Sequence, residues 1–154
     1  MEYLFERYRK IRRYMADTVH DLTTEQFNHI PSGFSNNIIW NLGHVVAAQQ
    51  GVCYVRSGKQ HKTDDDIFND YKPGTRPGKY VDSIGIDRIK SLLIPTIDIF
   101  EKDFIAGEFE VYTPWTTRYG VELADIKTAA EFLFFHEGIH LGYIAAMKKC
   151  LRKF

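Results

Sequence analysis

Two histidines near the end of the chain stand at a spacing that suits metal binding. Residues 136–140 read His-Glu-Gly-Ile-His, which is the H-E-x-x-H pattern of many zinc peptidases. On a helix, side chains four positions apart share one face, with Cβ atoms about 5–6 Å apart. Both imidazoles can therefore bind one metal ion. We expect Glu137 either to act as a catalytic residue that orients or deprotonates a metal-bound group, or to be a solvated glutamate.

A zinc peptidase of this pattern needs a third ligand, which usually lies downstream. Only the segment LGYIAAMKKCLRKF follows His140, and it contains no His, Asp or Glu. The chain of 154 residues is also short for a fold with a substrate cleft between two lobes. The sequence therefore predicts that the chain is not a peptidase of this class, and that a third ligand comes from upstream.

His44 is the best upstream candidate. It lies in the middle of the segment NNIIWNLGHVVAAQQ, where a lone histidine is more often a hydrogen-bonded core residue. Two facing helices can bring it to His136 and His140, so we predict a metal site formed by these three histidines. Asn41, one helical turn before His44, is a candidate hydrogen-bonding partner for the metal ligands.

Small and aromatic residues surround these histidines. Gly43, Gly138 and Gly142 each cost about 1 kcal/mol relative to alanine inside a helix. We expect a close approach of the second and last helices to compensate for that cost. Trp40 and Tyr143 are expected either to pack in the core or to line a pocket.

Three neutral imidazoles leave at least one coordination position open, which is typical of catalytic rather than structural zinc sites. An open metal can lower the pKa of bound water toward about 7, or hold a thiol as its thiolate. We expect one divalent ion. Zinc or nickel is favoured, while iron, manganese and cobalt also suit imidazole ligands.

Long segments with helical periodicity position these residues. They cover residues 3–22, 35–58, 83–106 and 128 to the end. Ser35 is the expected N-cap of the second, and Pro95 is expected to kink the third. Thr128 and Glu131 have the spacing of a capping box at the start of the last. The sequence thus predicts an all-α fold, a four-helix bundle formed by a single domain over residues 1–154.

Shorter segments connect the helices. A turn of helix is expected at residues 23–26, which have the spacing of a capping box. Residues 59–80 show no convincing period and predict a long connection between the second and third helices, either a simple crossing or a functional cover. Residues 108–120 alternate briefly and predict a short hairpin or an ordered loop.

The charge balance argues against a nucleic-acid partner, because 20 basic residues match 20 acidic residues. The basic segment over residues 7–13 is expected to be a solvated helix face, with binding of an anionic partner as the alternative. No apolar run approaches the roughly 20 residues that span a bilayer, and the charged first residues predict no signal peptide. Cys53 and Cys150 are expected to be reduced, which indicates the cytoplasm.

Two short motifs carry a resemblance to a known family. They are N-x-x-W-N-x-x-H in the second helical segment and H-x-x-x-H-x-G in the last, here Asn37, Trp40, Asn41, His44, His136, His140 and Gly142. With these motifs in a four-helix layout, nearly the whole chain resembles the DinB-like (DinB/YfiT) superfamily of metalloproteins. Many members have Gln after the glycine, where this chain has Tyr143, so the polar role of that Gln is not expected here.

The resemblance implies a four-helix bundle in which His44, His136 and His140 hold one divalent metal ion at one end of a pocket. It also implies kinship with enzymes that transfer groups to low-molecular-weight thiols. The first functional hypothesis is therefore a metal-dependent S-transferase with a small-molecule substrate, and a metal-dependent hydrolase is the next. The alternative of another class is a non-catalytic metal-binding bundle. Pairing as a homodimer is also expected for bundle faces of this kind.

Overall fold

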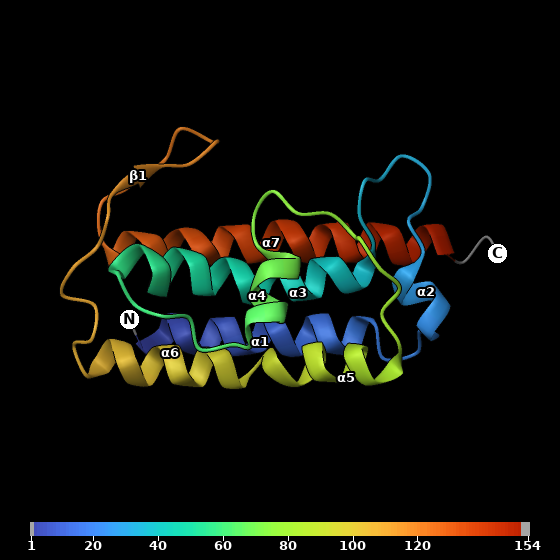
Figure 1. Ribbon diagram of the computed structural model, residues 1–154, viewed down its shortest axis with the longest axis horizontal. Coiled ribbons are helices and arrows are strands. Elements are labelled where there is room, and N and C mark those ends of the chain that lie inside the picture. Colours follow the sequence, from blue (N-terminus) through green and yellow to red (C-terminus); the bar gives the residue numbers. More distant parts are fainter. Residues whose placement is uncertain (1, 152–154) are drawn as a thin grey trace.

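Helices account for most of the computed structural model, which describes residues 2–151. Figure 1 shows long helical stretches lying side by side; they are α1 (Glu2–Thr18), α3 (Ile38–Gln49), α5 (Ser83–Leu92) followed by α6 (Pro95–Ile105), and α7 (Ile126–Leu151). Helix α7 contacts α3 and α1, while α3 also contacts α5 and α1 also contacts α6. The prediction of a helical fold is confirmed, with one small two-stranded hairpin in addition. Residues 1 and 152–154 of the expected domain lie outside the described residues.

Helix α3 lies at the centre of this arrangement, and every one of its residues is buried. It contacts α7 and α5, and also the two short helices α2 (Thr24–Asn28) and α4 (Asp65–Tyr71). Burial on all sides explains why the helix is apolar around its whole circumference. Within the described part of the chain, no helix is both long enough and apolar enough to cross a membrane. The residues of α3 are thus held by close packing against several neighbours.

The second predicted helix begins and ends differently in the structure. Asn37 rather than Ser35 is the N-cap, and its side-chain oxygen accepts a hydrogen bond from the Trp40 N–H at 2.9 Å. After α3 the chain continues through a π-helical turn over Gln50–Tyr54 and a 3₁₀ turn over Val55–Ser57. Gly58 ends this stretch with φ of 69°, a left-handed conformation that glycine adopts without strain.

Two further helix boundaries differ from their predictions. Asp125 caps α7, because its Oδ1 accepts from the Thr128 N–H at 2.8 Å while the Thr128 hydroxyl accepts from the Asp125 N–H at 3.1 Å. Thr128 is therefore the reciprocal partner and not the cap itself. Pro95 breaks the third predicted helix into two, since α5 ends at Leu92 and α6 begins at Pro95.

The long connection after the second helix contains a helix that the sequence pattern missed. Helix α4 has 7 residues and lies within the segment 59–80, where no period was expected. Arg88 of α5 forms ion pairs with Asp64 and Asp66 at the start of α4. Helix α4 also contacts α3 and buries Ile67 and Tyr71, so this connection is ordered.

The glycines near the histidines have different surroundings. A Cβ added at Gly43 would lie 2.5 Å from the ring of Tyr71, so the expected close approach is real at this position. The approaching element is α4, however, and not the last helix. A Cβ at Gly138 or Gly142 would meet no atom within 4 Å, so the close approach expected at these two glycines is wrong.

Two small elements were predicted, although the second strand of the hairpin lies just beyond the predicted segment 108–120. Helix α2 begins with a capping box, in which the Thr23 hydroxyl accepts from the Gln26 N–H at 3.3 Å and the Gln26 side chain accepts from the Thr23 N–H at 2.9 Å. Strands β1 (Trp115–Thr116) and β2 (Glu122–Leu123) form an antiparallel hairpin. Leu123 is buried and β2 contacts α7, so the hairpin is fixed to that helix.

We expect Gly43→Ala to lower the free energy of unfolding by about 1–3 kcal/mol, because the added methyl group overlaps the Tyr71 ring in a packed core. Gly138→Ala is the matched control on α7. There the methyl group meets open space, so alanine should raise the free energy of unfolding by about 0.5–1 kcal/mol. Urea denaturation measures both changes, and equal effects of the two substitutions would contradict the packing around Gly43.

Candidate metal centre

Three histidines from two helices meet at one place in the protein. His44 comes from α3, and His136 and His140 come from α7. Each offers one ligand atom, and these atoms all lie within 4.8 Å of one another. Their ring centroids are 5.3, 4.7 and 4.5 Å apart. The structure therefore brings together all three histidines that the sequence singles out.

Hydrogen bonds determine which nitrogen is free in two of the rings. Nδ1 of His44 lies 2.7 Å from the carbonyl oxygen of Tyr71, which can only accept, so this nitrogen carries the proton. Nδ1 of His140 lies 2.8 Å from Oδ1 of Asn41. The amide nitrogen of Asn41 donates to the Asn37 carbonyl at 2.8 Å, which leaves Oδ1 as the acceptor for His140. In both rings Nε2 is then the unprotonated nitrogen available to a metal ion.

The ring nitrogens of the two histidines of α7 are not all paired with hydrogen-bonding groups. Their Nε2 atoms lie 3.3 Å apart. Nδ1 of His136 is buried and has no hydrogen-bond partner among the described residues. An unprotonated Nε2 on His140 this close to a second ring nitrogen suits a shared cation, since a metal ion accepts electron pairs from both rings. The donor set therefore fits a divalent metal ion.

Burial keeps the three imidazoles neutral near pH 7. It lowers the pKa of His44, and it lowers the pKa of His136 to about 3 and of His140 to about 2. Repulsion from neighbouring imidazoles adds to the effect for His136 and His140, and the positive charge of Arg118 lowers the pKa of all three. Because neutral imidazole is the form that binds metal, the folded protein presents its ligands already deprotonated.

Aromatic residues flank the cluster on two sides. Trp40 stacks on His44 with ring centroids 4.5 Å apart, and its indole N–H donates to the Thr75 hydroxyl at 3.1 Å. Trp40 is buried, so it is a core residue that also forms a wall beside His44. The ring of Tyr143 lies 6.5 Å from that of His140, and Tyr143 is 47% exposed. Core packing is therefore the wrong interpretation for Tyr143, which lies on the solvent side of the site.

Of the two groups that orient the ligands, the sequence predicts one and misses the other. Asn41 is a hydrogen-bonding partner of the site as predicted, and the ring that it binds is that of His140, across the contact between α3 and α7. His44 is held by the backbone carbonyl of Tyr71, the last residue of α4. A backbone carbonyl carries no side-chain signal, so sequence patterns could not have identified it.

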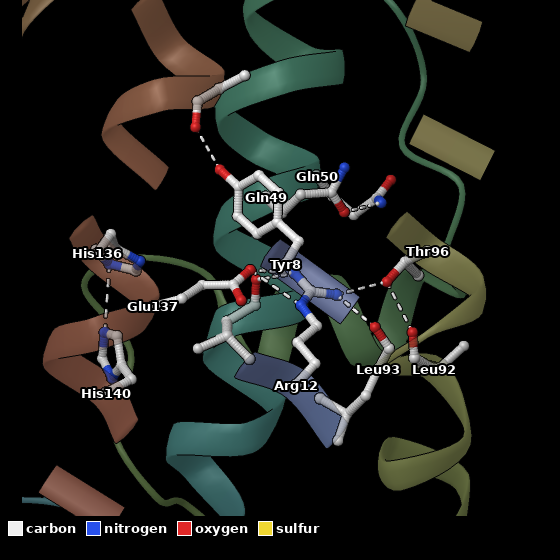
Figure 2. A network of polar contacts seen from close by, with 12 residues as sticks. Tyr8, Arg12, Gln49, Gln50, Leu92, Leu93, Thr96, His136, Glu137 and His140 are labelled. Carbon is white, nitrogen blue, oxygen red and sulfur yellow. Dashed lines mark hydrogen bonds and ion pairs between the residues drawn. The ribbon is translucent and has the colours of Figure 1, made fainter. Parts of the chain in front are cut away.

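Glu137 points away from the two histidines of α7 and into the core toward α1 (Figure 2). Its side chain is fully buried, so the interpretation as a solvated glutamate is wrong. Oε1 accepts hydrogen bonds from Nε of Arg12 at 2.9 Å and from Nη2 at 2.7 Å. Burial raises the pKa of the Glu137 carboxyl, and the charge of Arg12 opposes that rise. A catalytic role for Glu137 stays a prediction.

Arg12 is fully buried and connects several helices. Besides Glu137, it donates to the Leu93 carbonyl at 2.9 Å, the Thr96 hydroxyl at 2.8 Å and the Val45 carbonyl at 3.3 Å (Figure 2). These partners lie at the break between α5 and α6 and on α3. The expectation of a solvated face for the basic segment of α1 is therefore wrong at Arg12, because its donors all find partners in the core.

Comparison with known families agrees with this site. The family model described as the DinB superfamily matches residues 7–144, which include His44, His136 and His140. The chain therefore belongs to the DinB superfamily, as its two histidine motifs predict. A search among curated proteins finds no match.

We expect Arg12→Met to lower the free energy of unfolding by about 3–5 kcal/mol, because Glu137 would stay buried without its charged partner. The double variant Arg12→Met/Glu137→Leu should recover a large part of this loss, since neither charge is then left alone in the core. Guanidinium denaturation measures both variants. If the double variant were as unstable as the single one, the ion pair would not be the source of the effect.

Proposed function

We propose that this member of the DinB superfamily is a metal-dependent enzyme that transfers a group to a small thiol, with His44, His136 and His140 as ligands of one divalent ion. The observation that carries the proposal is the meeting of three neutral imidazoles, with Nε2 unprotonated on His44 and His140. We treat residues 1–154 as a single four-helix-bundle domain, in which α5 and α6 together take the place of one helix.

An incomplete set of protein ligands favours catalysis over a structural role. Among the described residues, no cysteine or carboxylate joins the three histidines as a fourth ligand. Structural zinc sites are usually closed by four protein ligands, whereas catalytic sites keep a position for water or substrate. His136 is only half-buried and Tyr143 is exposed, so a small molecule can approach the histidines from solvent.

The residues around the histidines would prepare the site for this chemistry. When bound, a divalent ion would supply a Lewis acid that lowers the pKa of a coordinated thiol or water. Asn41 and the Tyr71 carbonyl hold the rings of His140 and His44 in the orientation for binding. Trp40 shields one face of His44 from water. Zinc or nickel is the favoured ion, and iron, manganese and cobalt are compatible with the same ligands.

The contacts of Glu137 support a positioning role more than proton transfer. Its hydrogen bonds to Arg12 attach the turn of α7 that carries His136 to α1. Glu137 follows His136 by one residue, about 100° around the helix, so holding one side chain inward fixes the direction of the other. We therefore place Glu137 behind the site, where it sets the rotation of α7.

A non-catalytic metal-binding bundle is the second candidate. It is favoured by the position of the ligands on α3 and α7, two helices that pack against each other in the core. A metal ion there would tie the two helices together and stabilise the folded state by mass action. Hydrolysis by an activated water is a further enzymatic option at the same site.

Metal content and thiol transfer together test the proposal. We expect about one ion per chain in the natural protein, because three imidazoles on two helices form one site. His44→Ala, His136→Ala and His140→Ala should each lose the ion, and with it the reaction between a small thiol and chlorodinitrobenzene. His20→Ala changes an exposed histidine just after α1 and is the matched control, which should retain both.

The possible outcomes separate the candidates. Metal retained in His44→Ala would contradict a site shared between α3 and α7. Bound metal without thiol transfer, together with a large fall in melting temperature on chelation, would favour the non-catalytic bundle. Hydrolysis of an activated ester without thiol transfer would favour the hydrolase.

A further inference from the structure

The hairpin before α7 carries an arginine at its tip. The tip lies between β1 and β2, where the Thr117 N–H donates to the Val121 carbonyl at 2.9 Å and the Gly120 N–H donates to the Thr117 carbonyl at 2.9 Å. Gly120 has φ of 76°, which lets the chain reverse within a few residues. Arg118 and Tyr119 occupy this tight turn. Their side chains are therefore presented by a short, hydrogen-bonded structure and not by a long loop.

Aromatic contacts place this tip on the face of α7 that leads to the histidines. The ring of Tyr119 lies 6.2 Å from that of Phe132 and 5.6 Å from that of Phe135. Phe132 precedes His136 by one helical turn, so the two side chains lie on the same face of α7. Figure 1 shows the hairpin beside the first half of α7, in agreement with the contact between β2 and that helix.

The charge of Arg118 has no acidic partner in the described part of the chain. Its guanidinium lies over the Tyr119 ring, 5.0 Å from the centroid, and Nη2 donates to the Tyr119 hydroxyl at 2.9 Å. Arg88, in contrast, pairs with two aspartates, and Arg9 pairs with an aspartate and a glutamate. Arg118 is exposed, and the contacts of its neighbour Tyr119 with Phe132 and Phe135 place the hairpin tip beside the turn of α7 that leads to His136.

The described residues around the histidines supply no negative charge that would offset the charge of Arg118. Three neutral imidazoles do not offset the charge of a divalent ion. Glu137, the acidic residue within the α7 motif, points to the opposite side and is paired with Arg12. A divalent ion together with Arg118 would therefore make this side of the histidines electropositive, which attracts anions and repels cations. Guanidinium groups bind carboxylates well, since their donors match the two oxygens.

We propose that Arg118 determines specificity by binding an anionic group of the substrate, so that the site prefers small thiols that carry a carboxylate over neutral ones. This inference rests on the proposed function. The thiol would approach the open side of the histidines, and the carboxylate would accept hydrogen bonds from Arg118 at the hairpin tip. The aromatic rings of Tyr119 and Phe135, both partly exposed, would line the space between them.

The test uses the cobalt(II)-loaded protein and two thiols of the same length. Mercaptoacetate carries a carboxylate where mercaptoethanol carries a hydroxymethyl group, and binding of either as a thiolate adds a charge-transfer band to the cobalt spectrum. We expect Arg118→Ala to raise the Kd for mercaptoacetate about tenfold, the loss of one charge-assisted hydrogen bond. The Kd for mercaptoethanol should change less than about twofold. Arg13→Ala removes an equal charge from the exposed surface of α1 and should leave both Kd values unchanged.

The outcomes distinguish a failure of the Arg118 inference from a failure of the proposed function. Chelation of cobalt by the carboxylate of mercaptoacetate would persist in Arg118→Ala, so an unchanged Kd would overturn the inference. If Arg118→Ala raised the Kd of mercaptoethanol as much as that of mercaptoacetate, the inference would also be overturned, because Arg118 would then act on the thiolate that both share. Unchanged cobalt stoichiometry in Arg118→Ala confirms that the variant is folded. A wild-type protein that binds cobalt but shows no thiolate band with either thiol would contradict the proposed function, and this inference with it.

Discussion

Burial of imidazoles between α3 and α7 costs free energy unless each polar nitrogen finds a partner. The Tyr71 carbonyl and the Asn41 side chain meet this need for Nδ1 of His44 and His140. Nε2 of His140 is unprotonated and lies 3.3 Å from Nε2 of His136, and a divalent ion would bind these two rings together with His44. The same burial keeps the rings neutral. Packing of α3, α4 and α7 thus selects the tautomers of His44 and His140 before any metal is bound.

A second buried polar group fixes the rotation of α7 behind the histidines. Arg12 connects α1 to Glu137 of α7, to Val45 of α3 and to the break that Pro95 introduces between α5 and α6. A rotation of α7 that turned its histidines away from α3 would also pull Glu137 from Arg12 and leave two buried charges unpaired. The stability of the fold and the geometry of the site therefore depend on the same helix register.

The histidine cluster could be predicted because its signals are local. The spacing of the α7 pair and the motif around His44 lie within single helices, and packing of those helices brings the two signals together. The burial of Arg12 could not be predicted, since a basic run gives no sign that one member meets Glu137 far along the chain. Tyr71 acts through its backbone, at the end of a helix of 7 residues that is too short for a visible period. The position of Arg118 could not be predicted either, because it follows from the packing of the hairpin on α7.

X-ray absorption at the metal edge of the zinc-loaded protein would show whether the three-histidine site is open or closed. An open three-histidine site predicts three imidazole nitrogens at about 2.0–2.1 Å and one oxygen from water. Addition of mercaptoethanol should replace the oxygen by a sulfur at about 2.3 Å. A sphere closed by a fourth protein ligand and unchanged by the thiol would contradict the claim that the protein holds a metal open to its substrate.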